Sequence, residues 1–138
     1  MVVSVFGGTI AFAGSATAAT GESITVGNTA PEESGVTYTT SATVELSSSQ
    51  DMQYVDVTFA DADVSAVTES DITISSPGGD GGQSTFSRSG TDDLTLNSKG
   101  GGALDFTISS SVNVGDSDEV IIEVQDVTNP SNGGDHSY

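Results

Sequence analysis

The chain of 138 residues fits one domain, because domains cluster at about 100–150 residues. Twenty aspartates and glutamates stand against only two basic residues, Arg88 and Lys99, so the formal net charge is −18. Such a chain cannot neutralise a run of phosphates, which excludes nucleic acid as a partner and disfavours anionic membrane surfaces. The absence of cysteine excludes disulfides and thiolate metal sites.

The first nineteen residues carry no charge, and all twenty carboxylates follow them. An apolar core from Val2 to Ala13 leads into small residues, as in a secretory signal peptide. We predict a signal over residues 1–19, cleaved after Ala19, with cleavage after Ala18 as the alternative frame. The basic segment that normally precedes such a core is missing, so we expect the true start of the signal upstream of Met1. A transmembrane helix would need about 20 strongly apolar residues, and this run is shorter and contains three glycines.

Residues 4–19, SVFGGTIAFAGSATAA, resemble the signal peptide of haloarchaeal surface (S-layer) glycoproteins and related secreted proteins. The resemblance covers only the segment that cleavage would discard. It implies an export route, an extracellular or cell-surface location and a halophilic source, and it implies no activity.

The acidic composition has two interpretations. Low hydrophobicity with high charge favours disorder in dilute buffer. Concentrated salt shortens the screening length from about 10 Å at 0.1 M to about 3 Å at 1 M, which removes most of the self-repulsion of a folded acidic domain. The near-absence of lysine and the strand periodicity described next favour a folded domain adapted to brine.

Period-two alternation of apolar and polar residues recurs along residues 20–138. The clearest run is Thr37–Leu46, in which Tyr38, Thr40, Ala42, Val44 and Leu46 share one face, as in a half-buried antiparallel strand. A single helical turn is expected at Ser65–Thr68, capped by Asp63 or Ser65. The other predicted strands are Ile24–Val26, Val55–Phe59, Asp71–Ile74, Thr85–Ser87, Leu94–Leu96, Leu104–Ile108 and Glu119–Val124.

Seven or eight short strands separated by turns, with no long amphipathic helix, predict an all-β fold for residues 20–138, an Ig-like antiparallel β-sandwich. Ser137-Tyr138 looks like the start of a last strand that is truncated before it can pair. Residues 119–138, EVIIEVQDVTNPSNGGDHSY, resemble the closing hairpin of Ig-like domains in haloarchaeal secreted proteins. This resemblance implies that Tyr138 is the first inward anchor of the final strand, and that the domain is part of a longer chain.

No catalytic motif emerges from the sequence. His136 is the single histidine and lies close to the end of the chain, where a nucleophile–base pair would lack the rigid third group it needs. There is no Gly-x-Ser-x-Gly elbow, His-Glu-x-x-His motif or phosphate loop. We therefore predict a protein without catalytic residues.

Calcium is the one cofactor that the sequence suggests, because it takes about six to eight oxygen ligands and acidic loops supply them. The best cluster is Asp116, Asp118 and Glu119, followed by Asp61 and Asp63. Neither follows the EF-hand order of ligands, and the competing interpretation of each is a solvated acidic turn.

These observations predict a secreted or cell-surface structural or adhesive module. Its partners would be other surface proteins or copies of itself, with no nucleic acid and no membrane span in this segment. Two alternatives stay open: an accessory module of a secreted enzyme, and an extracellular filament subunit completed by a strand that a neighbour donates to an open edge.

Overall fold

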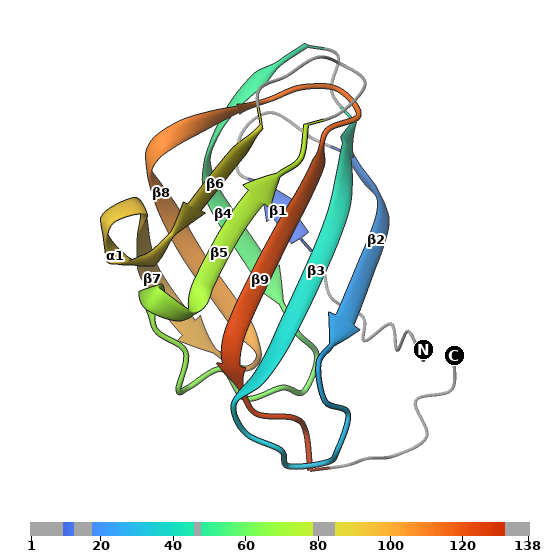
Figure 1. The fold of residues 1–138 in the computed structure, drawn as a ribbon, viewed down its shortest axis with the longest axis vertical. Coiled ribbons are helices and arrows are strands. Elements are labelled where there is room, and N and C mark those ends of the chain that lie inside the picture. The colour runs from blue at the N-terminus through green and yellow to red at the C-terminus, as the bar shows by residue number, and fades with distance from the viewer. Residues whose placement is uncertain (1–9, 13–17, 46–47, 79–84, 132–138) are drawn as a thin grey trace.

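A computed structural model describes residues 10–12, 18–45, 48–78 and 85–131. The predicted Ser137-Tyr138 strand and His136 lie outside these ranges. Nine strands and two short helical segments follow one another along the described chain (Figure 1): β1 (Ile10–Phe12), β2 (Ala18–Val26), β3 (Val36–Glu45), β4 (Gln50–Thr58), η1 (Glu69–Asp71), β5 (Ile72–Ser76), β6 (Phe86–Ser89), α1 (Gly90–Asp93), β7 (Leu94–Gly100), β8 (Ala103–Val114) and β9 (Glu119–Val127).

The strands form two antiparallel sheets that pack face to face (Figure 1). One sheet has the order β1-β4-β8-β7 and the other the order β2-β3-β9-β5-β6. The predicted all-β sandwich is therefore confirmed, with eight strands, β2 to β9, following the short β1. β1 itself falls within the segment predicted to be a signal.

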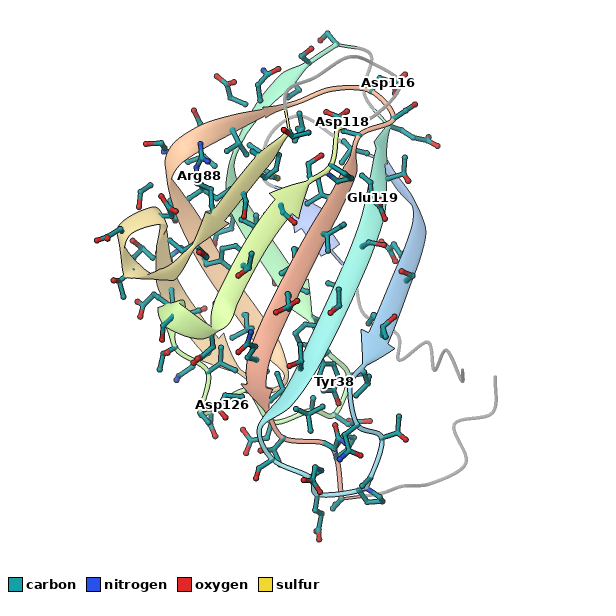
Figure 2. All side chains as sticks on the ribbon, in the orientation of Figure 1. Tyr38, Arg88, Asp116, Asp118, Glu119 and Asp126 are labelled. Atoms are coloured by element: carbon teal, nitrogen blue, oxygen red, sulfur yellow. The ribbon has the colours of Figure 1, made fainter. Side chains whose placement is uncertain are left out.

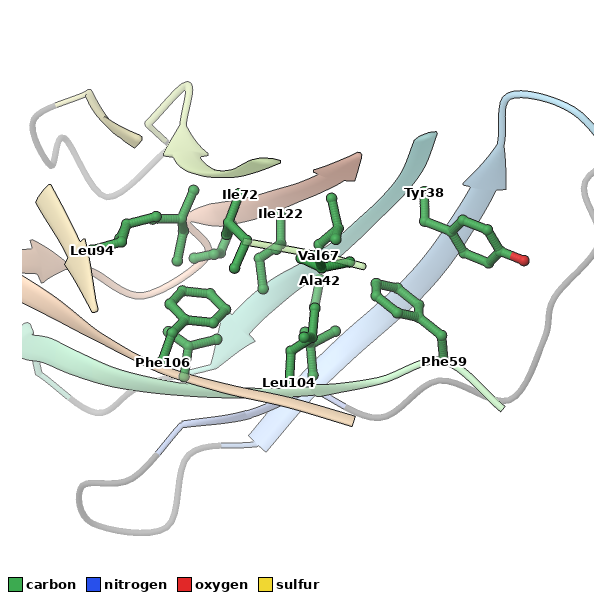
Figure 3. Packing of buried hydrophobic residues seen from close by; sticks show 14 of the residues in the cluster. Tyr38, Ala42, Phe59, Val67, Ile72, Leu94, Leu104, Phe106 and Ile122 are labelled. Carbon is green, nitrogen blue, oxygen red and sulfur yellow. The ribbon is translucent and has the colours of Figure 1, made fainter. Parts of the chain in front are cut away.

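The hydrophobic core lies between the sheets, where the predicted alternation is confirmed (Figure 3). Tyr38 and Ala42 of β3 face inward from one sheet, and Leu104 and Phe106 of β8 face inward from the other, all at most 1% exposed. The rings of Tyr38 and Phe59 meet across the interface, with centroids 5.1 Å apart and planes tilted by 58°. Such tilted aromatic pairs add to the stabilisation that burial alone provides.

The segment between β4 and β5 crosses from one sheet to the other. Its apolar residues Ala62, Val64 and Val67 are buried in the core. At the helical turn predicted over Ser65–Thr68, the structure has a hydrogen-bonded turn and no helix: the Val67 N–H donates to the Val64 carbonyl at 3.1 Å. The 3₁₀ helix η1 begins after it, at Glu69, and Thr68 is its cap. The Asp71 carboxylate accepts hydrogen bonds from both the backbone N–H and the hydroxyl of Thr68, which fixes the start of η1 at Glu69.

The two ends of the sandwich differ. At one end, a turn that contains Asp116 and Asp118 joins β8 to β9 (Figure 2). At the other end, Tyr38 lies near the start of β3 and Asp126 near the end of β9 (Figure 2). β9 has nine residues, so at about 3.3 Å per residue the two ends are roughly 30 Å apart.

Candidate functional site

The turn between β8 and β9, residues 115–118, contains the acidic cluster that the sequence singles out. Ser117 adopts a φ of 65°, a left-handed conformation that reverses the chain. Its N–H donates to the carbonyl of Val44 at 2.8 Å, and the N–H of Val44 donates to the carbonyl of Asp118 at 2.9 Å. The turn is therefore fixed to the end of β3, on the neighbouring strand of the five-stranded sheet.

Asp118 is the buried member of this cluster, with 1% of its surface exposed. Its Oδ2 accepts a hydrogen bond from the backbone N–H of Gly115 at 2.6 Å, which closes the turn. Its Oδ1 is buried and has no hydrogen-bond partner among the described residues. A carboxylate accepts hydrogen bonds at about four positions on its two oxygens, so Asp118 is poorly satisfied.

The structure does not bring the three predicted calcium ligands of this turn to one point. Successive residues of a strand point to opposite faces, and Val120 points into the core, so Glu119 faces outward on β9. Asp116 is exposed on the turn (Figure 2). Within the described ranges, no group of three or more His, Cys, Asp or Glu side chains is arranged to hold a metal ion.

The second predicted pair, Asp61 and Asp63, lies on the segment after β4. Asp63 forms a backbone bridge with Thr128, which follows β9, so this pair is at the opposite end of β9 from Asp118. Oδ1 of Asp63 accepts a hydrogen bond from the N–H of Ser65 at 2.8 Å, and this bond lowers the pKa of the Asp63 carboxyl. Asp63 therefore caps the turn that follows it.

A polar network on the outer face of the four-stranded sheet was not predicted. The Tyr54 hydroxyl on β4 donates to Asp105 on β8, and this hydrogen bond is the main reason why the pKa of Tyr54 is raised. Asn97 on β7 donates to Asp105 at 3.0 Å and to Thr107 at 2.8 Å. Alternation placed Asp105 and Thr107 outward, but only the strand order brings Asn97 and Tyr54 beside them.

Comparison with known proteins gives no match to any family model, to any curated protein or to any solved structure. In the part of the chain that the structure describes, no helix has the length and apolar character needed to cross a membrane. The function therefore has to be argued from the residues and their geometry.

Proposed function

We propose that this chain is a secreted or cell-surface structural module, adapted to concentrated salt, whose partners are other surface proteins or copies of itself. The observation that carries the proposal is the distribution of charge over the sandwich. Eighteen of the twenty carboxylates lie in the described residues, since Asp80 and Asp135 fall outside them. Of these eighteen, only Asp118 is buried.

A surface with this distribution of charge is suited to passive display. Exposed carboxylates keep the surface hydrated, while the two packed sheets supply stiffness without any moving part. The apolar start of the chain and its small-residue exit support an export route, and its resemblance to haloarchaeal surface proteins supports a high-salt environment.

The export step is tested by the N-terminus of the natural product. Cells of the source organism are separated into cytoplasmic, envelope and medium fractions, and the protein is analysed by mass spectrometry. We expect it in the envelope or the medium, beginning at Ala19 or Thr20. A cytoplasmic protein that retains residues 1–19 would contradict the proposal.

The edge of β4 favours a second candidate, a subunit that accepts a donated strand. Among the described residues, β4 meets only β1 on this side, through the pairs Ile10–Val57, Ala11–Asp56 and Phe12–Val55. Residues 50–54 of β4 have no described strand there, and β4 contains neither the lysine nor the proline that commonly protects a sheet edge. Removal of residues 1–19 would uncover the whole edge.

Light scattering in molar salt tests this second candidate. Residues 20–138 should associate, whereas the full chain, whose β1 covers part of the edge, should remain monomeric. Gln53 lies in the register shift of β4 and has no register partner on β8. We therefore expect proline to be accommodated there and, because it lacks an N–H, to obstruct pairing with a new strand. Gln53→Pro should abolish the association and Gln53→Ala should retain it. Monomeric behaviour of residues 20–138 would exclude the candidate.

A further inference from the structure

Asp118 is the one described carboxylate that is removed from water, and one of its two oxygens has no partner in the part of the chain that the structure describes. The remaining described carboxylates are exposed or half-buried and can be solvated directly. A single hydrogen bond from Gly115 satisfies only part of what an ionised carboxylate requires. An unsatisfied buried polar group in a native protein calls for an explanation, such as an ordered water or a bound ion.

The surroundings of Asp118 favour a cation over a second hydrogen-bond donor. Asp116 and Glu119 lie within two residues of it, and the chain has only two basic residues to offset its acids. The resulting negative potential attracts cations to this end of the sandwich. Two backbone carbonyls are hydrogen-bonded to N–H groups of this turn, that of Val44 on β3 to Ser117 and that of Gly115 to Asp118. Each accepts one such hydrogen bond and keeps a second lone pair.

Oxygen ligands of this kind, carboxylate and carbonyl, select a hard cation, and calcium accepts them in flexible geometry with water completing the shell. We propose that Asp118, through its unpaired Oδ1, is the carboxylate ligand of a weak calcium site at the β8–β9 turn. The proposal retains Asp118 from the predicted cluster, does not use Glu119, and requires nothing of the Asp116 side chain except its charge.

One carboxylate predicts weak binding, with a Kd of about 10⁻⁴–10⁻³ M, the range of extracellular calcium modules. In this respect the inference rests on the proposed extracellular function. Binding would also stabilise the fold, because the turn joins β8 to β9 and is hydrogen-bonded to β3 through Val44.

Thermal melting of the full chain tests the site. The protein is freed of divalent ions with a chelator and then titrated with calcium chloride in a fixed molar concentration of potassium chloride. Because a ligand that binds only the native state stabilises it by mass action, calcium at 100 times its Kd should raise Tm by about 10 °C. The absence of a shift would overturn the proposal, as would an equal shift with magnesium or sodium.

Two matched variants assign the effect to Asp118. Asp118→Asn keeps an oxygen that can accept from Gly115 and removes the charge, so it should abolish the calcium shift. Asp126→Asn makes the same change of charge on an exposed residue near the opposite end of β9, and it should preserve the shift (Figure 2). An unchanged shift in Asp118→Asn would overturn the assignment.

A measurement on the unsubstituted protein keeps the proposal testable if Asp118→Asn does not fold. In amide NMR spectra recorded during the calcium titration, Gly115 should show one of the largest changes, because its N–H is bonded to the Asp118 carboxylate. Changes confined to other parts of the chain would overturn the site. Neither result bears on the export experiment, so the two proposals can fail separately.

Discussion

Asn129 joins the end of β9 to the loop between β2 and β3. Its Oδ1 accepts from the Tyr38 hydroxyl at 2.8 Å, and its Nδ2 donates to the carbonyls of Asn28 and Ala30 at 2.8 and 2.6 Å. The side chain is 6% exposed, so these partners cannot easily turn to water. Asn129 is thus the polar centre of its end of the sandwich.

We expect Asn129→Ala to lower the free energy of unfolding by about 3 kcal/mol, because it leaves several buried groups without partners. Urea denaturation at constant molar salt measures the change. Asn113→Ala is the control, since Asn113 is exposed and hydrogen-bonds only to Asp51 among the described contacts. A loss no larger than that of the control would mean that the Asn129 contacts contribute little.

Because the Tyr38 hydroxyl is buried, we expect the free energy of unfolding to fall at alkaline pH. Burial raises the pKa of its hydroxyl above the usual value of 10.0, so the folded state holds the proton more tightly than the unfolded state does. The stabilisation that the protonated Tyr38 hydroxyl gives to the folded state is complete below pH 10. It is lost as the pH rises from there through the pKa of the folded state. Tyr38→Phe should flatten the pH dependence of the urea midpoint between pH 9 and 11.

Tyr54→Phe is the comparison, because the pKa of Tyr54 is raised mainly by its hydrogen bond to Asp105 on the outer face of the sheet. Its effect on the alkaline slope should be smaller than that of Tyr38→Phe, since solvent reaches this face. The reverse order would show that burial of Tyr38 is not what holds its proton.

At the scale of elements, the hairpin between β7 and β8 is packed closely against the residue that follows β4. Gly102 has a φ of +80°, and a Cβ added to it would overlap the carbonyl oxygen of Phe59, whose N–H donates to the carbonyl of Gly102 at 2.8 Å. We expect Gly102→Ala to cost more than about 3 kcal/mol of unfolding free energy, because both the backbone conformation and the contact must change.

Gly101 provides a matched control one residue away. It has a φ of +58°, but nothing lies within 4 Å of an added Cβ. Gly101→Ala should therefore cost only the left-handed conformation, about 1 kcal/mol, in the same denaturation measurement. Equal losses in the two variants would show that the contact with Phe59 is not important.

The elements could be predicted wherever a strand has one buried face. The predicted run Thr37–Leu46 corresponds to β3 as far as Glu45, and Leu46 lies outside the described residues. Val55 and Val57 of β4 are buried as expected. The bounds were less accurate, since β8 extends to Val114, beyond the predicted end at Ile108. Exposed Ser109, Ser110 and Ser111 interrupt the alternation there and lie in a register shift between β8 and β4. Backbone pairing with β4 resumes at Val112–Val114, and no local pattern predicts it.

At the scale of the whole molecule, the sites depend on contacts that no local pattern contains. The sequence indicated Asp118 as acidic, but its burial results from the turn being held against Val44 of β3. The role of Asn129 likewise comes from partners that are distant along the chain, whereas Asn97 depends on its pairing with the next strand, β8. The order of strands in each sheet decides these contacts, and it was not predictable from alternation.

The acidic surface of the whole molecule predicts that its stability depends on salt concentration. The two basic side chains donate to backbone carbonyls, Lys99 to that of Val67 at 2.6 Å and Arg88 to that of Ser87 at 3.0 Å. Two positive charges offset only a small part of the twenty acidic side chains. Residues 20–138 should unfold cooperatively in molar salt and lose about 2 kcal/mol at 0.1 M, where charges repel over about 10 Å. For a domain of this size, this loss lowers Tm by roughly 5–10 °C.

Salt can also stabilise proteins by strengthening the burial of apolar surface, so a charge variant is needed to assign the effect. Replacement of four exposed acids by their amides reduces the net charge and leaves the core intact, and it should reduce the difference in Tm between 0.1 M and molar salt. The four are Glu22, Glu32, Glu33 and Asp92. If the amide variant shows the same salt dependence as the parent, repulsion between surface carboxylates is not the cause, and the salt dependence would have to come from the apolar core.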